Sequence, residues 1–149
     1  IVGFPGETDE EFQETFDFIA KHKFSELHVF PYSSRIGTPA ARMDNQIDED
    51  VKNERVHKLI ALSDQLAKEY ASKFEDDVLE VIPEEKGSFH GSLVGYADNY
   101  MKVQFDGDES LIGQIVKVKI VHADYPLNKG EALRVVEHAS NLSEQEVLM

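Results

Sequence analysis

A short alternating stretch, VKVKI at residues 116–120, decides the fold of the second half of this chain. Apolar residues take every second position, and lysines fill the positions between them. Because successive side chains of a β-strand point to opposite faces, this period of two predicts a strand with one buried and one exposed face. Residues 100–105, YMKVQF, have the same period. Their apolar members should face inward, and the outward set should be Tyr100, Lys102 and Gln104.

Stretches of this kind recur from residue 78 to residue 136, with turn residues between them. The breaks contain glycine, aspartate and asparagine, as in the run Asp106-Gly107-Asp108. Five short strands in about 60 residues predict a small closed β-barrel of OB-like type. The predicted strands span Val78–Pro83, Ser88–Tyr96, Tyr100–Phe105, Ile115–His122 and Ala132–Val136.

The beginning of the chain has a helical pattern flanked by two apolar stretches. The first stretch runs into the turn Pro5-Gly6, and Thr8 and Glu11 have the spacing of a capping box. We therefore expect a helix over residues 9–22, followed by a buried strand at residues 24–30. A strand, a helix and a strand in this order form one βαβ unit, which belongs in a parallel sheet whose other strands lie upstream.

A second, longer helix is predicted from an N-cap at Asp48 to about Phe74. Its cations recur at three-residue spacing and form one basic stripe: Lys52, Arg55 and Lys58. Acidic residues close by can pair with them, so we expect a solvated face rather than an RNA contact. These acids are Glu49, Asp50 and Glu54. The buried stripe should consist of apolar residues: Val51, Val56, Leu59, Ile60, Leu62, Leu66, Tyr70 and Phe74.

The composition limits the classes of function. The chain has 149 residues and no cysteine, which excludes disulfide bonds and thiolate-held zinc or iron–sulfur sites within it. Its net charge of −14 repels phosphate at long range, so RNA binding would need basic residues clustered locally. There is no apolar run long enough for a membrane span and no recognisable signal peptide, so we expect a soluble, cytoplasmic protein.

The glycine-rich turn Gly3-Phe4-Pro5-Gly6-Glu7 is the first candidate site. Two glycines between a strand and a helix allow the backbone to approach a ligand closely, and a helix N-terminus offers free N–H groups. The alternative is an ordinary left-handed turn followed by a capping box. The turn is not a P-loop, because no Gly-Lys-Ser/Thr follows it.

The loop at residues 30–40 is the second candidate site. It leaves the end of a predicted parallel strand, which is where α/β sheets place their ligands. Arg35 offers a planar fork for a carboxylate or a phosphate, with the hydroxyl groups of Tyr32, Ser33 and Thr38 nearby. The alternative is a surface loop that carries one solvated arginine.

The outer face of the barrel is the third candidate. If the strands at residues 100–105 and 115–122 are neighbours, an aromatic residue and three lysines share that face: Tyr100, Lys102, Lys117 and Lys119. Stacking surfaces combined with cations suit single-stranded RNA. The alternative is the ordinary polar face of a barrel. No catalytic residue stands out, and the six histidines lack the spacing of metal ligands.

Two motifs resemble the late strands of radical-SAM methylthiotransferases: IVGFPGET at residues 1–8 and LHVFPYSSRIGTPAA at residues 27–41. Residues 78–136 resemble the C-terminal TRAM domain of these enzymes, with YADNY at 96–100 and SLIG at 110–113 as markers. The resemblance implies an α+β fold, in which a βαβ-α remnant of a radical-SAM (β/α) partial barrel occupies residues 1–74. A five-stranded OB-like TRAM barrel that binds RNA would follow at residues 75–138, and a flexible acidic tail at 139–149.

The resemblance also implies a substrate. Arg35 stands where an acidic residue would point to the branch that acts on a ribosomal protein, so a tRNA branch is favoured. The run HVFPYS at residues 28–33, with Arg42-Met43 and Gln46 after it, is most similar to one branch. That branch converts N6-threonylcarbamoyladenosine, next to the anticodon, to its 2-methylthio form. The isopentenyladenosine branch is the near alternative, and the implied partner is the tRNA anticodon stem-loop in either case.

Enzymes of this family use S-adenosylmethionine (SAM) and two 4Fe-4S clusters on upstream cysteines. The resemblance implies that this chain supplies part of the SAM-site wall: Gly3, Phe4, Pro5, Gly6, Glu7, Phe30, Tyr32 and Arg35. Without cysteines, the chain alone should be inactive. Because it begins at Ile1, we expect a longer polypeptide whose upstream part completes the sheet. Strand edges left exposed without that part would allow dimers to form. The alternatives are a non-catalytic TRAM module that binds RNA and a protein-interaction module.

Overall fold

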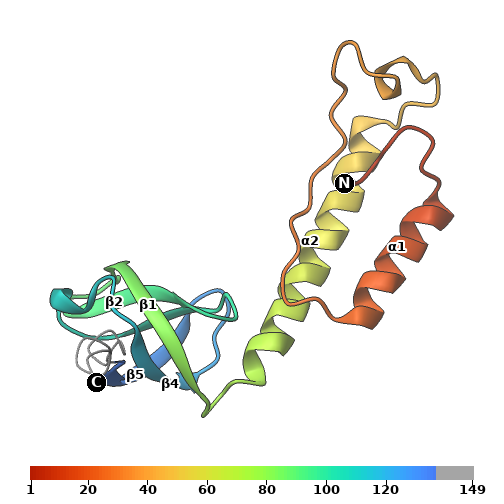
Figure 1. Ribbon diagram of the computed structural model, residues 1–149. Helices are drawn as coiled ribbons and strands as arrows, with labels where there is room; N and C mark the ends of the chain where they lie inside the picture. Colours follow the sequence, from red (N-terminus) through yellow and green to blue (C-terminus); the bar gives the residue numbers. More distant parts are fainter. Residues whose placement is uncertain (137–149) are drawn as a thin grey trace, which may run out of the picture. The chain divides into compact units, whose positions relative to one another are not determined.

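The computed structural model describes residues 1–136 and has an α+β architecture with a closed five-stranded β-barrel (Figure 1). The chain divides into two compact units, Ile1–Lys73 and a second unit that begins at Phe74. The first unit contains α1 (Asp9–His22), the 3-10 turn η1 (Ala40–Arg42) and α2 (Glu49–Ser72). The second contains β1 (Val78–Lys86), β2 (Ser92–Ala97), β3 (Lys102–Asp106), η2 (Glu109–Leu111), β4 (Val116–His122) and β5 (Asn128–Val135). The predicted tail at residues 139–149 lies outside the described residues.

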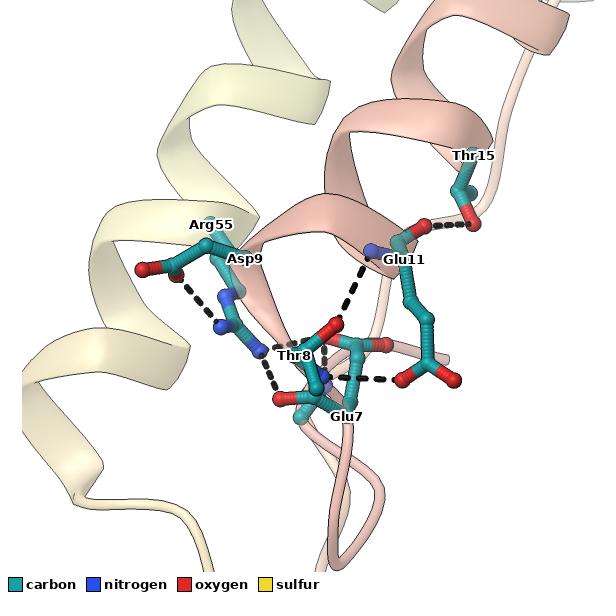
Figure 2. Close-up of polar contacts among 7 residues, drawn as sticks. Glu7, Thr8, Asp9, Glu11, Thr15 and Arg55 are labelled. Carbon is teal, nitrogen blue, oxygen red and sulfur yellow. Dashed lines mark hydrogen bonds and ion pairs between the residues drawn. The ribbon is translucent and has the colours of Figure 1, made fainter.

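Helix α1 has the bounds and the capping box that the sequence predicts. The Thr8 hydroxyl accepts a hydrogen bond from the N–H of Glu11 at 3.1 Å, and the Glu11 carboxylate accepts one from the N–H of Thr8 at 2.9 Å (Figure 2). Three acidic residues in the first turn add a favourable interaction with the helix dipole. At the other end Lys23 adopts a left-handed conformation, and its N–H donates to the carbonyl of Ile19. Both ends of α1 are therefore fixed by local sequence.

The predicted strand at residues 24–30 is wrong, because the structure contains no strand there. The nearest β-pairing comes just after this segment, in an isolated parallel bridge between Val2 and Pro31. The N–H of Val2 donates to the carbonyl of Phe30 at 2.9 Å. Further back, the N–H of Leu27 donates to the hydroxyl of Ser63 on α2. The segment therefore uses a helix side chain as a partner where a strand would use a neighbouring backbone.

Helices α1 and α2 lie side by side in the first unit (Figure 1) and share a small apolar core. Its buried members are Val2, Phe12, Leu59, Leu62 and Leu66. Asp48 occupies the N-cap position of α2 as predicted, but its side chain makes no capping hydrogen bond, and the helix ends at Ser72 rather than Phe74. No helix among residues 1–136 combines the length and the apolar character needed to cross a membrane.

The barrel closes in the order β1-β2-β3-β5-β4, so strand β5 lies between β3 and β4. All pairs are antiparallel except β3 with β5, which are parallel and share only two register pairs. Several predicted strand ends are corrected. Strand β1 continues past Pro83 to Lys86 through a bulge, which lets a proline remain in the strand. Strand β2 begins at Ser92 rather than Ser88, and β5 begins at Asn128 rather than Ala132.

The barrel interior is filled by alternate residues of the strands, as the period of two predicts. Side chains that are almost fully buried include Val81, Leu93, Val103, Phe105, Val116, Val118 and Ile120. One predicted outward residue is wrong, because Gln104 is only 7% exposed. Its amide is held by hydrogen bonds with the hydroxyl groups of Ser88 and Ser92. These hydroxyls satisfy the amide, which removes most of the cost of burying a polar group.

Candidate functional site

The glycine-rich turn before α1 is held in place by Arg55 of helix α2 (Figure 2). One guanidinium nitrogen lies 2.6 Å from the Glu7 carboxylate and 3.1 Å from the Glu7 carbonyl oxygen. A second nitrogen lies 2.7 Å from the carboxylate of Asp9. Glu7 also accepts a hydrogen bond from the N–H of Gly3 at 3.0 Å. The carboxylate of Glu7 thereby connects the start of the turn to the middle of α2.

Arg55 is buried, and this corrects the prediction of a solvated basic stripe on α2. Burial by itself would lower the pKa of Arg55. The hydrogen bonds and negative charges of Asp9 and Glu7 together outweigh this effect, so the pKa of Arg55 lies above the ordinary arginine value. The guanidinium also lies 5.5 Å from the centroid of the Phe12 ring. Its Nε is buried and has no hydrogen-bond partner in the structure. The group is a permanent internal cation that orders the turn.

Lys52 is the second buried cation of the predicted stripe. Its ammonium group donates to the carbonyl of Tyr32 at 3.3 Å and pairs with Glu49. Its methylene stem fills the space beside Gly3, where a Cβ atom would come within 2.2 Å of the lysine Cγ. Gly3 also has φ +73°, a conformation that suits glycine. The missing side chain of Gly3 thus makes room for Lys52.

The second candidate segment lines a hollow of about 570 Å³. Its lining includes Phe30, Tyr32 and Arg35, together with Thr38 and Ala40. Arg35 is exposed, and among residues 1–136 it makes no ion pair. The hydroxyl oxygen of Tyr32 is buried and has no hydrogen-bond partner within the described chain. Both residues line the hollow, and an unpaired hydroxyl and an unpaired guanidinium are groups that can bind a polar ligand.

The two candidate segments touch each other but line different hollows. The rings of Phe4 and Tyr32 meet edge to face, with centroids 5.5 Å apart. The N–H of Tyr32 donates to the carbonyl of Val2 at 2.7 Å, so the segments run in parallel where they meet. Phe4, Pro5, Gly6 and Glu7 line a separate hollow of about 880 Å³ with Glu11, Glu14, Thr15, Phe18 and Asn45.

The lysines predicted to form one RNA-binding face are not on neighbouring strands, because β5 lies between β3 and β4. Each of them is also paired with a carboxylate. Lys102 lies 3.5 Å from Glu85. Lys117 lies 2.8 Å from Glu80, its register partner on β1, and Lys119 lies 3.0 Å from Asp76.

Tyr100 precedes β3 in a left-handed conformation (φ 66°) and is 81% exposed. It is exposed, as the alternation predicts, but it lies in the connection before β3 rather than on the predicted strand. The condition for their shared face, that the two strands are neighbours, is not met, and RNA binding by Tyr100 and the three lysines stays a prediction.

The structural role of Arg55 was not predicted from the sequence, although its position in the helical repeat places it on the buried face. Positions 52, 55, 59, 62 and 66 recur at spacings of three and four, so two cations lie on the same buried face as three leucines. Polar residues in that register indicate an internal partner, and the partner here is the carboxylate of Glu7.

Among residues 1–136 there is no cluster of three or more side chains that could hold a metal ion. The full sequence contains no cysteine, so the thiolates that an iron–sulfur cluster requires are absent from all 149 residues. An iron–sulfur cluster does not fit this chain.

Comparison with known proteins agrees with this division of the chain. The family model of the TRAM domain matches residues 73–125, which include β1 to β4 but not β5. The chain is 69% identical over 140 residues to the threonylcarbamoyladenosine tRNA methylthiotransferase of Bacillus subtilis (strain 168). That match covers 92% of this chain and 31% of the relative.

Two further relatives carry the name tRNA-2-methylthio-N(6)-dimethylallyladenosine synthase. The protein from Aquifex aeolicus (strain VF5) is 42% identical over 137 residues, covering 92% of this chain and 31% of its own length. The protein from Alkaliphilus oremlandii (strain OhILAs) is 42% identical over 136 residues, covering 90% and 29%. This chain spans just under a third of the length of these relatives, and over about nine-tenths of its own length it is similar to tRNA methylthiotransferases.

Proposed function

We propose that this chain is part of an enzyme that adds a 2-methylthio group to N6-threonylcarbamoyladenosine, next to the anticodon of a tRNA. The observation that supports it is the 69% identity to a threonylcarbamoyladenosine tRNA methylthiotransferase, because the match extends over 92% of this chain. The relatives named for dimethylallyladenosine are 42% identical over a similar span. The isopentenyladenosine branch is therefore the second candidate. The modification of a tRNA would place the enzyme in the cytoplasm.

The first unit would form part of the wall of a SAM site in a radical-SAM partial barrel. The Val2–Pro31 bridge would continue the parallel sheet of that barrel, and the segments Gly3–Glu7 and Phe30–Arg35 leave this bridge side by side. The orphaned hydroxyl of Tyr32 and the exposed guanidinium of Arg35 fit a polar cofactor. SAM would supply the radical in the complete enzyme, and the residues here would bind and orient it. Two 4Fe-4S clusters would be held by cysteines elsewhere in that enzyme.

The second unit would hold the tRNA through its TRAM barrel. Tyr100 is available for stacking, since it is 81% exposed. Lys102, Lys117 and Lys119 would each exchange a carboxylate partner for an RNA phosphate. A non-catalytic module that binds RNA would need only the barrel. That function would not account for the ordered turn around Glu7.

The test is a modification assay on tRNA that carries N6-threonylcarbamoyladenosine, with mass spectrometry of the digested nucleosides. We expect the 2-methylthio product from the complete enzyme with SAM and reconstituted clusters. The 149-residue chain under the same conditions should give no product, because it has no cysteine to hold iron. A matched tRNA that carries isopentenyladenosine should remain unmodified. If only the tRNA with isopentenyladenosine gave product, the chain would belong to the isopentenyladenosine branch. If neither tRNA gave product, the proposed enzymatic function would be refuted.

A further inference from the structure

A hollow of about 570 Å³ opens on the barrel between two of its loops. Ser88 and Phe89 come from the connection between β1 and β2, and residues 124–127 come from the connection between β4 and β5. The end of β3 and the start of β5 form the floor. In five-stranded OB-like barrels, these two loops are where oligonucleotides bind. The hollow also falls within the size range of sites for small ligands.

An aromatic side chain stands at this hollow in an exposed position. Phe89 lines it and is 56% exposed. Tyr125 of the opposite loop is a second aromatic residue in the lining. A large exposed aromatic surface has an unfavourable contact with water, and a nucleobase stacked on it removes that contact. The ring of Phe89 therefore offers a flat surface for an unstacked base.

The polar group within the hollow is held rigidly. Gln104 lines the hollow and is 7% exposed. Its amide nitrogen lies 3.2 Å from the hydroxyl of Ser88 and 3.3 Å from that of Ser92. Both N–H groups of the amide are used by these bonds, and its Oε1 accepts one hydrogen bond from the Ser88 hydroxyl at 3.3 Å. The second lone pair of Oε1 can accept a hydrogen bond from the amino group of a base without first losing conformational freedom.

The charges around the hollow favour a base over a phosphate inside it. Asp106 and Asp124 both line it, and their carboxylates repel phosphate but accept hydrogen bonds from the amino group of a base. Lys129, the register partner of Gln104, makes no ion pair within residues 1–136. The other four lysines of the described barrel are all paired: Lys86, Lys102, Lys117 and Lys119. Lys129 is thus the lysine of the described barrel that can bind an RNA phosphate without first breaking an ion pair.

We propose that this hollow binds one unstacked base of the tRNA anticodon loop, which stacks on Phe89, contacts Gln104 and leaves its phosphate to Lys129. The base class is one with an exocyclic amino group. This inference rests on the proposed function, because it takes tRNA as the partner, and it adds a base-binding contact to the phosphate contacts proposed for Lys102, Lys117 and Lys119.

The first test measures the affinity of the 149-residue chain for a fluorescein-labelled anticodon stem-loop. Phe89→Ala should raise the Kd roughly 5- to 150-fold, which is the usual effect of losing one stacked base. Phe24→Ala is the matched control, since Phe24 is also exposed (42%) but lies in the first unit, and its Kd should equal that of the wild type. Equal Kd values for Phe89→Ala and the wild type would overturn the proposal.

A second variant gives a direct readout of stacking. The sequence contains no tryptophan, so Phe89→Trp introduces a single indole group at the hollow. We expect this variant to keep its affinity and its fluorescence to be quenched by the stem-loop, but not by a duplex stem that lacks loop nucleotides. Unchanged fluorescence at saturating stem-loop would contradict stacking at this position.

A third pair of variants tests the phosphate contact. Lys129→Gln should lower the slope of log Kd against log salt by about 0.7, the amount expected for one single-strand phosphate. Lys86→Gln changes the net charge equally, but Lys86 does not line the hollow, so its replacement should leave the slope unchanged. If the wild type binds and none of the hollow variants differs, the hollow is refuted while the tRNA function stands. If the wild type and the complete enzyme both fail to bind, the tRNA function itself fails.

Discussion

Arg55 illustrates how one charged residue can order a segment that is distant in sequence. The residues it binds, Glu7 and Asp9, precede it by 48 and 46 positions. The capping box of Thr8 and Glu11 was predictable because both partners lie within four residues and their geometry follows from the helix. No local rule pairs residue 55 with residue 7. The fold must bring them together first, so sequence reasoning placed Arg55 in solvent.

Arg55→Met should destabilise the first unit by about 2–4 kcal/mol, because it leaves the Glu7 carboxylate without its buried partner. Chemical denaturation followed by circular dichroism measures the free energy of unfolding. Hydrogen exchange at the N–H of Gly3, which donates to Glu7, should accelerate in the same variant. Lys58→Met is the control, since Lys58 forms an exposed pair with Glu54 and should cost less than about 1 kcal/mol. Equal effects of the two substitutions would refute the role of Arg55.

At the scale of elements, the barrel shows what alternation can and cannot predict. The period of two placed five strands, because burial of one face is a local property of each strand. It did not give the strand order, which depends on long-range pairing. This is why Lys102 and Lys117 were expected on one face, although β5 separates their strands. It also missed the start of β5, since residues 128–130 have the composition of a turn while they pair with β3 and β4.

Gly95 is the glycine on which the barrel depends most directly. A Cβ atom at this position would come within 2.1 Å of the carbonyl oxygen of Ile82 and 2.5 Å of the Pro83 Cα, at the bulge of β1. Gly95→Ala should therefore destabilise the barrel by about 1–3 kcal/mol, as overpacking does. Gly107→Ala is the matched control, because its Cβ would meet only side-chain atoms at 3.1 Å or more. Thermal melts of both variants check this, and similar melting temperatures would count against the close approach.

For the whole molecule, the net charge of −14 opposes any contact with RNA, because it repels the phosphates. Replacing Lys102, Lys117 and Lys119 with glutamate should weaken tRNA binding by the complete enzyme and flatten its salt dependence, by about 0.7 in slope for each phosphate that the variant no longer binds. Lys21→Glu, Lys68→Glu and Lys73→Glu, made together at exposed positions of the first unit, change the net charge by the same amount and should leave the slope unchanged. Binding titrations at several salt concentrations measure both quantities. An unchanged slope would remove the three lysines from the interface.

The parallel junction between β3 and β5 has a consequence for the barrel as a whole. Only two rungs join these strands, and the side chain of Asn128 adds one more hydrogen bond to the carbonyl of Lys102. Local opening of a closed barrel is expected first at the strand pair with the fewest hydrogen bonds. Gln104 on β3 and Lys129 on β5, which line the hollow, belong to this pair. A nucleotide bound across the junction between β3 and β5 would hold these two strands together. The affinity of the chain for RNA and the stability of the barrel against unfolding should therefore increase or decrease together.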